Sequence, residues 1–269
     1  MAVSVQVVNF TKETTGTPGV TQDVNLNFTP KAIRVISNGD TANDTAAANY
    51  MYCEGMSDGT NHACLTGTSR DNTPAGAGSR IHRQDAVLVI QTTAASPPNA
   101  IVVQGTCSFS TNKVTFTWGT NTTRAYRIKL LAFGGDDITN AIVLNTTVTA
   151  ASPGNQDYTG LGFTVTDDNG VAFQLHGART ADTGAAPLDF TIGTAVSPSK
   201  RWTIGQMSEN TADPTDTWRS HFTDQFLSLH STADGTIFCN ADFNSWISDG
   251  LRLAWTGTLS PTTFISFLV

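Results

Sequence analysis

The 269-residue chain has little charge and almost no glutamate. Only 14% of its residues are charged, against about a quarter in ordinary soluble domains. Glutamate occurs three times, at Glu13, Glu54 and Glu209, whereas threonine occurs 43 times. Because glutamate favours helices and threonine favours strands, this bias predicts an all-β protein.

The chain also lacks basic runs and long apolar runs. Its net charge is −7, which argues against nucleic-acid binding through phosphate neutralisation. No apolar stretch reaches the roughly 18 residues that a membrane-spanning helix needs, so membrane insertion is not expected. Residues 1–20 are polar and rich in threonine rather than leader-like. Any export is therefore expected to occur without a classical leader, or by lysis of a host.

Cysteine is scarce, at four residues, which excludes a small disulfide-rich secreted scaffold. Cys53 and Cys64 flank an Asp58-Gly59 dipeptide. In a two-residue hairpin centred on that dipeptide, they would face each other with Cα atoms about 4.5–5.5 Å apart, within reach of a disulfide. Buried free thiols and a Cys53–Cys64 disulfide both stay open, with a metal pair the least favoured interpretation.

Motifs that carry catalysis or cofactor binding are missing. The five histidines show no metal-binding spacing, and no nucleophile elbow, phosphate-binding loop or dinucleotide fingerprint is found. Paired aspartates beside Gly or Asn are typical of turns. The acidic loops 167–170 and 213–216 offer oxygens for calcium, but the Asp-x-Asp-x-Asp-Gly pattern is absent. We therefore expect no enzyme, no catalytic residues, no metal and no cofactor.

What the chain does contain is a long internal repeat. Phe28 precedes Trp118 by 90 residues, and Phe163 precedes Trp255 by 92. Apolar segments and turns follow in the same order within each copy, with a period near 137 residues. Such a period is too long for a solenoid and matches an ordinary domain. The chain is therefore predicted to consist of two tandem homologous modules, residues 1–134 and 135–269.

Short alternating segments between Gly, Pro, Asn and Asp turns predict strands throughout both modules. The predicted strands lie near residues 2–10, 20–28, 31–37, 49–55, 62–68, 85–92, 101–109, 113–118, 124–133, 138–148, 157–164, 170–177, 188–194, 200–207, 224–231, 236–243, 250–256 and 262–268. Residues 70–80 read as a loop, and only 216–229 is compatible with a short helix. Each module is thus predicted to be a jelly-roll-like β-sandwich.

The tryptophans raise the question of a binding surface. Trp118 and Trp255 occupy equivalent places in the two copies, so they are predicted to be core residues. Trp202 lies in an alternating strand and is predicted to be core as well. Trp218 and Trp246 lie in polar segments of the second module only. They are either contacts for a glycan or receptor, or buried anchors of their loops.

Three segments carry a resemblance to known proteins. Residues 28–32 (FTPKA), 69–72 (SRDN) and 131–140 (LAFGGDDITN) resemble a family of duplicated β-proteins encoded among the structural genes of tailed bacteriophages. The similarity covers nearly the whole chain, and no site residue can be carried over from it. The resemblance implies a virion component, such as a head decoration or fibre, a neck or collar protein, or a tail-associated protein.

These observations together predict a non-enzymatic structural protein, assembled in the host cytoplasm, released by lysis and displayed on the virion or cementing it. Its expected partners are capsid, collar or tail proteins and further copies of itself. Strand 2–10 or the C-terminal strand would dock on a neighbour. The alternative is an adhesin that binds a host surface glycan through second-module loops, with Trp218 and Trp246 as contacts.

Overall fold

The computed structural model describes residues 3–42, 49–70, 78–92, 100–148, 153–177, 188–208, 217–230, 236–257 and 263–269. Within these ranges all regular structure is β-strand. The predicted all-β class is confirmed. No helix of the length and apolarity needed to cross a membrane occurs in this part of the chain.

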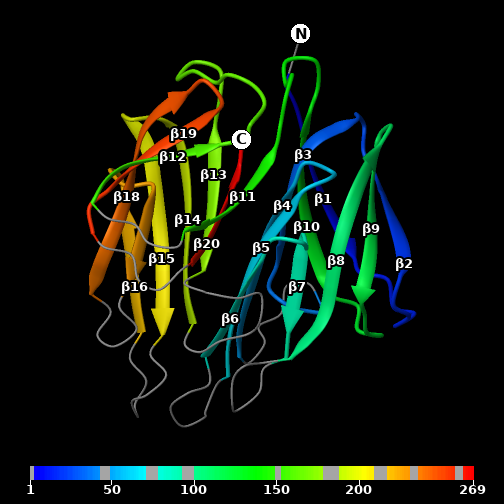
Figure 1. Cartoon of the computed structure of the whole chain (residues 1–269). Coiled ribbons are helices and arrows are strands. Elements are labelled where there is room, and N and C mark those ends of the chain that lie inside the picture. Colours follow the sequence, from blue (N-terminus) through cyan, green and yellow to red (C-terminus); the bar gives the residue numbers. More distant parts are fainter. Residues whose placement is uncertain are drawn as a thin grey trace.

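The first half of the chain forms ten strands. They are β1 (Ser4–Thr11), β2 (Val20–Asn25), β3 (Pro30–Ser37), β4 (Tyr50–Ser57), β5 (His62–Ser69), β6 (Gly78–Arg83), β7 (Leu88–Gln91), β8 (Ile101–Ser110), β9 (Lys113–Thr120) and β10 (Arg127–Gly134). A six-stranded sheet has the order β1-β10-β3-β4-β5-β6, and a four-stranded sheet has the order β2-β9-β8-β7. These two sheets form the first sandwich (Figure 1).

The second half repeats this arrangement strand for strand. Its strands are β11 (Val143–Val148), β12 (Gly154–Thr159), β13 (Ala172–Gly177), β14 (Leu188–Ser197), β15 (Lys200–Ser208), β16 (Thr217–Phe222), β17 (Leu227–His230), β18 (Ile237–Ile247), β19 (Gly250–Trp255) and β20 (Thr263–Leu268). The sheet orders are β11-β20-β13-β14-β15-β16 and β12-β19-β18-β17. Adding ten to each first-module label reproduces them, as two tandem homologous sandwiches require.

The chain is rolled up at its ends and meanders in its middle. In the first module β1 pairs with β10 in one sheet while β2 pairs with β9 in the other. This nesting of first and last strands is the jelly-roll-like part of the fold. Between them, β3 to β6 form a meander in one sheet and β7 to β9 a meander in the other. The predicted module boundary after residue 134 falls between the end of β10 and the start of β11.

Two strands were not predicted, and they are counterparts. β6 begins within the predicted loop 70–80, and β16 lies in the segment 216–229 that was compatible with a helix. Both strands are short, rich in polar side chains and placed at the end of their six-stranded sheet. An edge strand can be polar on both faces, so the alternation that reveals interior strands is weak there.

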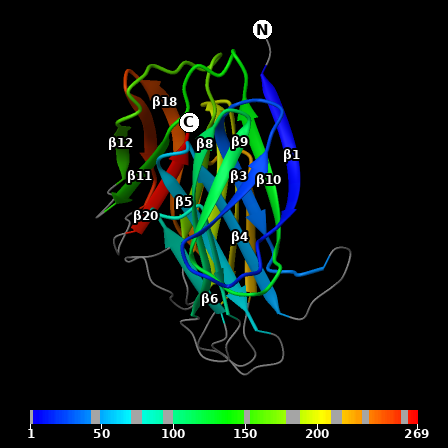
Figure 2. The same ribbon diagram turned by 90° about the vertical axis from the view of Figure 1, so that its right-hand side faces the viewer.

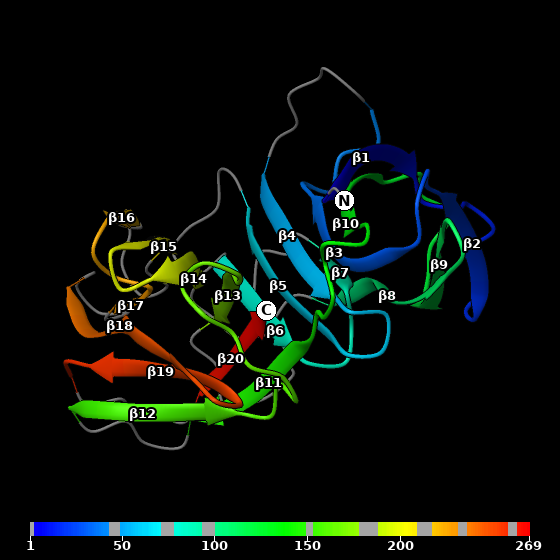
Figure 3. The same cartoon turned by 90° about the horizontal axis from the view of Figure 1, so that it is seen from above.

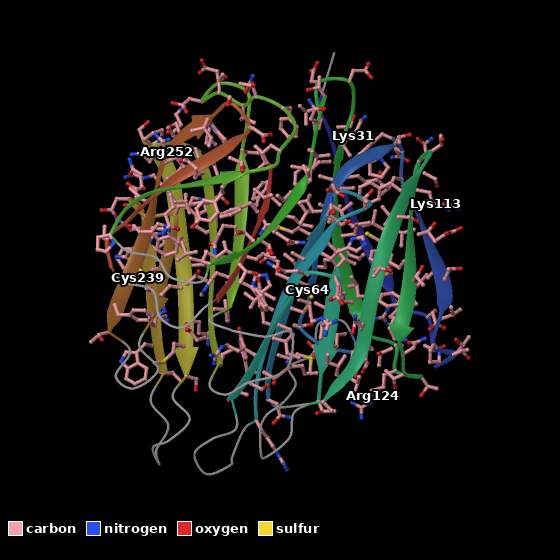
Figure 4. The ribbon with its side chains drawn as sticks, viewed as in Figure 1. Lys31, Cys64, Lys113, Arg124, Cys239 and Arg252 are labelled. Atoms are coloured by element: carbon pink, nitrogen blue, oxygen red, sulfur yellow. The ribbon has the colours of Figure 1, made fainter. Side chains whose placement is uncertain are left out.

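Each module has its own apolar core between its two sheets. Trp118 and Trp255 are buried in the first and second core, respectively, which confirms the prediction for this pair. The outer faces of the four-stranded sheets also correspond. Lys113 pairs with Asp23 across β9 and β2, and Arg252 pairs with Asp157 across β19 and β12; Figure 4 labels Lys113 and Arg252 on opposite sides of the molecule.

A third apolar core joins the two modules, which we call the module interface. Seen from above, the six-stranded sheets lie in the middle and the four-stranded sheets outside them (Figure 3). The outward faces of the six-stranded sheets therefore pack against each other. Ten buried apolar residues make up this core: Ala32, Met56, Ala63, Leu65, Val143, Leu175, Leu188, Phe190, Ile192 and Leu268.

Aromatic rings and a close backbone approach define the packing at the module interface. Tyr52 stacks on Phe190 with ring centroids 5.4 Å apart and an interplanar angle of 9°. Gly67 of β5 leaves the space that Leu188 occupies, because a Cβ at this position would lie 2.2 Å from Leu188 Cδ1. A larger residue at Gly67 would push the sheets apart.

The module interface is not two-fold symmetric. The first module contributes mainly β5 and β6, and the second contributes mainly β13 and β14. Under two-fold symmetry, the contact between β5 and β14 would be matched by an equal contact between β15 and β4, which is not among the main contacts of the described residues. The two modules therefore use the same sheet face, but the strands that make the main contacts differ between them.

The two strands proposed for docking differ in exposure. β20 lies between β11 and β13, so both of its edges are already paired. β1 pairs only with β10 and forms the margin of its sheet, visible at the side of the first module in Figure 2. Of the two predicted docking strands, only β1 has a free edge in the described part of the chain.

The module interface makes a prediction about stability. Phe190 is 5% exposed, so Phe190→Ala should lower the free energy of unfolding by about 3–5 kcal/mol. Each module retains its own core, so the variant should also unfold in two steps in calorimetry. Phe238→Ala is the matched control, because Phe238 is 40% exposed. Equal stability of the two variants would contradict the interface.

Candidate functional site

The β4–β5 hairpin places the two predicted cysteines differently from expectation. The loop contains four residues, 58–61, rather than two. Cys53 consequently lies opposite Thr66, and Cys64 lies opposite Gly55. The predicted direct opposition of Cys53 and Cys64 is wrong by a shift of two residues.

The side chain of Asp58 explains the longer loop. Its carboxylate accepts hydrogen bonds from the N–H groups of Thr60 and Asn61, at 2.8 and 2.7 Å, a common way for Asp to close a turn. Cys53 and Cys64 are both buried free thiols, and Cys64 lies between the sheets of the first module (Figure 4). Burial raises the pKa of the Cys64 thiol well above its ordinary value, so it is a packing residue at neutral pH.

The two predicted contact tryptophans pack against the second module. The indole N–H of Trp246 donates to the carbonyl oxygen of Val196 at 2.9 Å. Its ring meets Phe243 edge to face, with centroids 4.9 Å apart. Trp218 is half-buried in β16, opposite the buried Met207 of β15. Neither indole projects freely from a described loop.

The prediction that Trp202 is a core residue is wrong. Trp202 is 38% exposed, as is Ile204 at 37%. Alternation along β15 turns Thr203 and Met207 inward, where they are buried. The strand carries apolar side chains on both faces, so its sequence does not reveal which face meets the core.

The packing of the half-buried Trp246 ring makes a second prediction. Trp246→Ala removes a ring contact and leaves the Val196 carbonyl without its partner, so it should lower the free energy of unfolding by about 3 kcal/mol. Trp202→Ala is the matched control and should cost at most about 1 kcal/mol, because it removes surface packing only. Chemical denaturation measures both. If Trp246→Ala left the free energy of unfolding unchanged, Trp246 would again be a candidate for ligand contact.

A chain of hydrogen bonds runs through the module interface. His82 of β6 lies 2.9 Å from Ser266 Oγ, and Ser266 donates to Asn145 Oδ1 at 2.7 Å. Asn145 Nδ2 in turn donates to the backbone oxygens of His62 and Gln84 at 2.9 and 3.0 Å. Since the Ser266 proton goes to Asn145, His82 Nε2 is the donor to Ser266. The chain thus links β6 of one module to β20 and β11 of the other.

Buried histidines are the feature that sequence patterns did not reveal. His82 and His176 are fully buried, and His62 and His230 nearly so. Burial lowers the pKa of His82 to about 3. The pKa of His176 is well below its ordinary value for the same reason, with nearby His82 adding to the effect. Near neutral pH, His82 and His176 are therefore uncharged.

These pKa values make a prediction about acid stability. The pKa of His82 falls from its ordinary 6.5 to about 3 on folding, so the unfolded chain binds more protons between these two values. Stability is fully present above pH 6.5 and falls as pH drops towards 3, by up to about 1.4 kcal/mol per pH unit for each such histidine. His82→Gln should show a shallower decline of unfolding free energy between pH 7 and 4. If the slope of unfolding free energy against pH were the same in His82→Gln as in the wild type, His82 would not be a source of the acid sensitivity.

The acidic loops do not assemble a metal site in the described residues. In these ranges no group of three His, Cys, Asp or Glu side chains lies close enough to hold an ion. Asn169 closes its own loop, accepting a hydrogen bond from the Thr166 N–H at 2.7 Å. The other candidate loop, 213–216, lies outside the described residues.

Two hollows mark the surface. One of about 320 Å³ lies between β11 and β12 and is lined mainly by polar residues, including Asp157. The other, of about 410 Å³, lies at the end of β1 and β3 and the start of β10. It is lined by Phe10, Ile36 and Ile128 together with polar residues that include Arg127 and Lys129. Asp157 is engaged by Arg252. The second hollow combines three large apolar side chains with polar ones.

The free edge at β1 is apolar and uncharged. Val3, Val5 and Val7 are 56%, 54% and 64% exposed, and residues 1–11 contain no charged side chain. Natural proteins usually guard a free sheet edge with charge, proline or a covering segment, and β1 contains neither charge nor proline. This edge is the clearest candidate contact surface of the first module.

The described surface therefore offers places for contact, at β1 and on β15, in addition to the two hollows. The sequence matches no protein-family model and has no significant match among curated proteins.

Proposed function

We propose that the protein is a non-enzymatic structural component of a tailed-phage virion, displayed on the particle or cementing it. The observation that carries this proposal is the free edge of β1, with exposed valines and no charge. Such an edge favours pairing with another chain. It suits a protein whose edge is covered by a capsid, collar or tail neighbour in an assembly.

The packing of the modules supports the same role. The module interface joins the two sandwiches through an apolar core and through the hydrogen bonds of Asn145 to the backbone of His62 and Gln84. The molecule is therefore built as one block rather than as two tethered domains. A rigid block repeated around a particle can bind through many weak contacts, which add up to high avidity. The resemblance to structural proteins of tailed phages points the same way.

The alternative of a glycan-binding adhesin has less support. It needs exposed aromatic faces in second-module loops, whereas Trp246 is hydrogen-bonded to Val196 and packed on Phe243. Trp218 is half-buried opposite Met207. The hydrogen bond and the ring contact make Trp246 an anchor within its own module, so we do not carry this alternative further.

The test is to find the protein in its particle. Gradient-purified virions of the encoding phage should contain the protein at a fixed copy number by quantitative mass spectrometry. Gold-labelled antibody should decorate one defined region of the particle in electron microscopy. Detection in infected-cell lysate but not in purified virions would overturn the proposal.

A second arm tests the β1 edge. Purified protein should bind particles that lack it, whereas Val5→Lys should bind at least tenfold less, because it places charge on the edge. Phe238→Lys is the matched control, an exposed apolar residue on β18 far from β1 in the fold. If Val5→Lys binds like the wild type, the edge has no role in docking.

A further inference from the structure

Parts of both six-stranded sheets stay bare outside the module interface. In the first module, Val5, Val7, Leu131 and Ile36 face outward on β1, β10 and β3; we call these residues the β1 strip. Two basic residues share this face, Lys129 opposite Ile36 and Arg34 opposite Leu131. In the second module, Trp202 and Ile204 face outward on β15; we call them the β15 strip. Six of the seven large apolar residues exposed in the described chain lie on or directly beside these strips.

Both strips continue the module interface from its two margins. Val5 of the β1 strip pairs with Phe133, which packs against the interface core. Ile204 of the β15 strip pairs with Ile192, a member of that core. The apolar faces therefore extend past the area that the two modules cover in each other.

Each strip has a covered counterpart in the other module. β11 is the counterpart of β1, and its outward Val143 is 3% exposed in the module interface. β5 is the counterpart of β15, and its outward Ala63 and Leu65 are fully buried there. The contact between β5 and β11 thus joins the counterparts of the two strips. The larger part of the module interface is made by β13 and β14, whose counterparts β3 and β4 contribute the buried Ala32 and Met56.

This arrangement follows from the asymmetry of the module interface. A contact that joins two different surfaces leaves one unused copy of each surface when only two modules are linked. Figure 3 shows the two six-stranded sheets meeting near β5, β6, β13 and β14 and diverging towards β1 and β16. The unused surfaces lie on the diverging parts.

We propose that a second copy of this chain seats its β15 strip on the β1 strip. The hollow of about 410 Å³ beside Ile36, which Arg127 and Lys129 also line, gives the β1 strip room for a projecting side chain such as the Trp202 indole. The contact would bury the exposed valines and the indole in the way that Leu65 and Val143 are already buried. It uses the outward face of β1, whereas the docking proposed above uses the unpaired edge of that strand, so it goes beyond the virion role.

Single substitutions on either strip test the contact. Wild-type protein at micromolar concentration should self-associate in sedimentation velocity and in light scattering. Val7→Asp and Trp202→Asp should each be monomeric, because each removes one side of the same contact. Phe238→Asp is the matched control and should associate like the wild type, since Phe238 is 40% exposed but lies outside both strips. Circular dichroism and thermal unfolding check that each variant is folded.

Mixing the two variants is the decisive step. Val7→Asp keeps an intact β15 strip and Trp202→Asp keeps an intact β1 strip, so an equimolar mixture should form a dimer that contains one of each. If Trp202→Asp does not fold, Ile204→Lys replaces it. A wild type that stays monomeric, or a mixture that does, would overturn the proposal. So would self-association lost in Val7→Asp but kept in Trp202→Asp, because the β1 strip would then pair with itself.

Discussion

The apolar outer faces of the two six-stranded sheets are the constraint on which the rest of the structure depends. A sandwich normally buries one face of each sheet and exposes the other to water. Here the outer faces carry Leu65 and Phe190 as well, so neither module is complete without a cover. Packing these faces together makes the sandwiches a four-layer block, and it decides which strands are interior and which stay free.

Burial at this interface also dictates how its polar groups are arranged. Glu54, one of only three glutamates, is 1% exposed and is engaged by both Arg34 and Tyr52. Arg34 in turn lies over the ring of Phe173, 4.7 Å from its centroid. A buried carboxylate is tolerated only when it is paired and hydrogen-bonded. The hydrogen bonds that link His82, Ser266 and Asn145 satisfy buried polar groups in the same way, but between uncharged side chains.

The sequence was sufficient for the class, the duplication and most strands, because period-two alternation and the spacing from Phe28 to Trp118 are local or repeated signals. It did not reveal β6 and β16, whose polar side chains weaken that alternation. A tight hairpin would place Cys53 opposite Cys64. The turn closed by Asp58 contains two more residues than that hairpin, so the two cysteines are not opposite each other. The alternating strand around Trp202 predicts a core residue, but alternation alone does not say which face of the strand meets the core. The buried histidines depend on which module covers which sheet face, and no local pattern records that.

The unequal use of the two sheet faces has a consequence for shape at larger scale. Had the modules met about a two-fold axis, the molecule would present the same surface at both ends. Instead one end carries valines on a sheet margin and the other an indole on a sheet face. The molecule therefore has a polarity, with a head distinct from its tail. Any array built by joining such ends inherits a direction, although it is assembled from two copies of one fold.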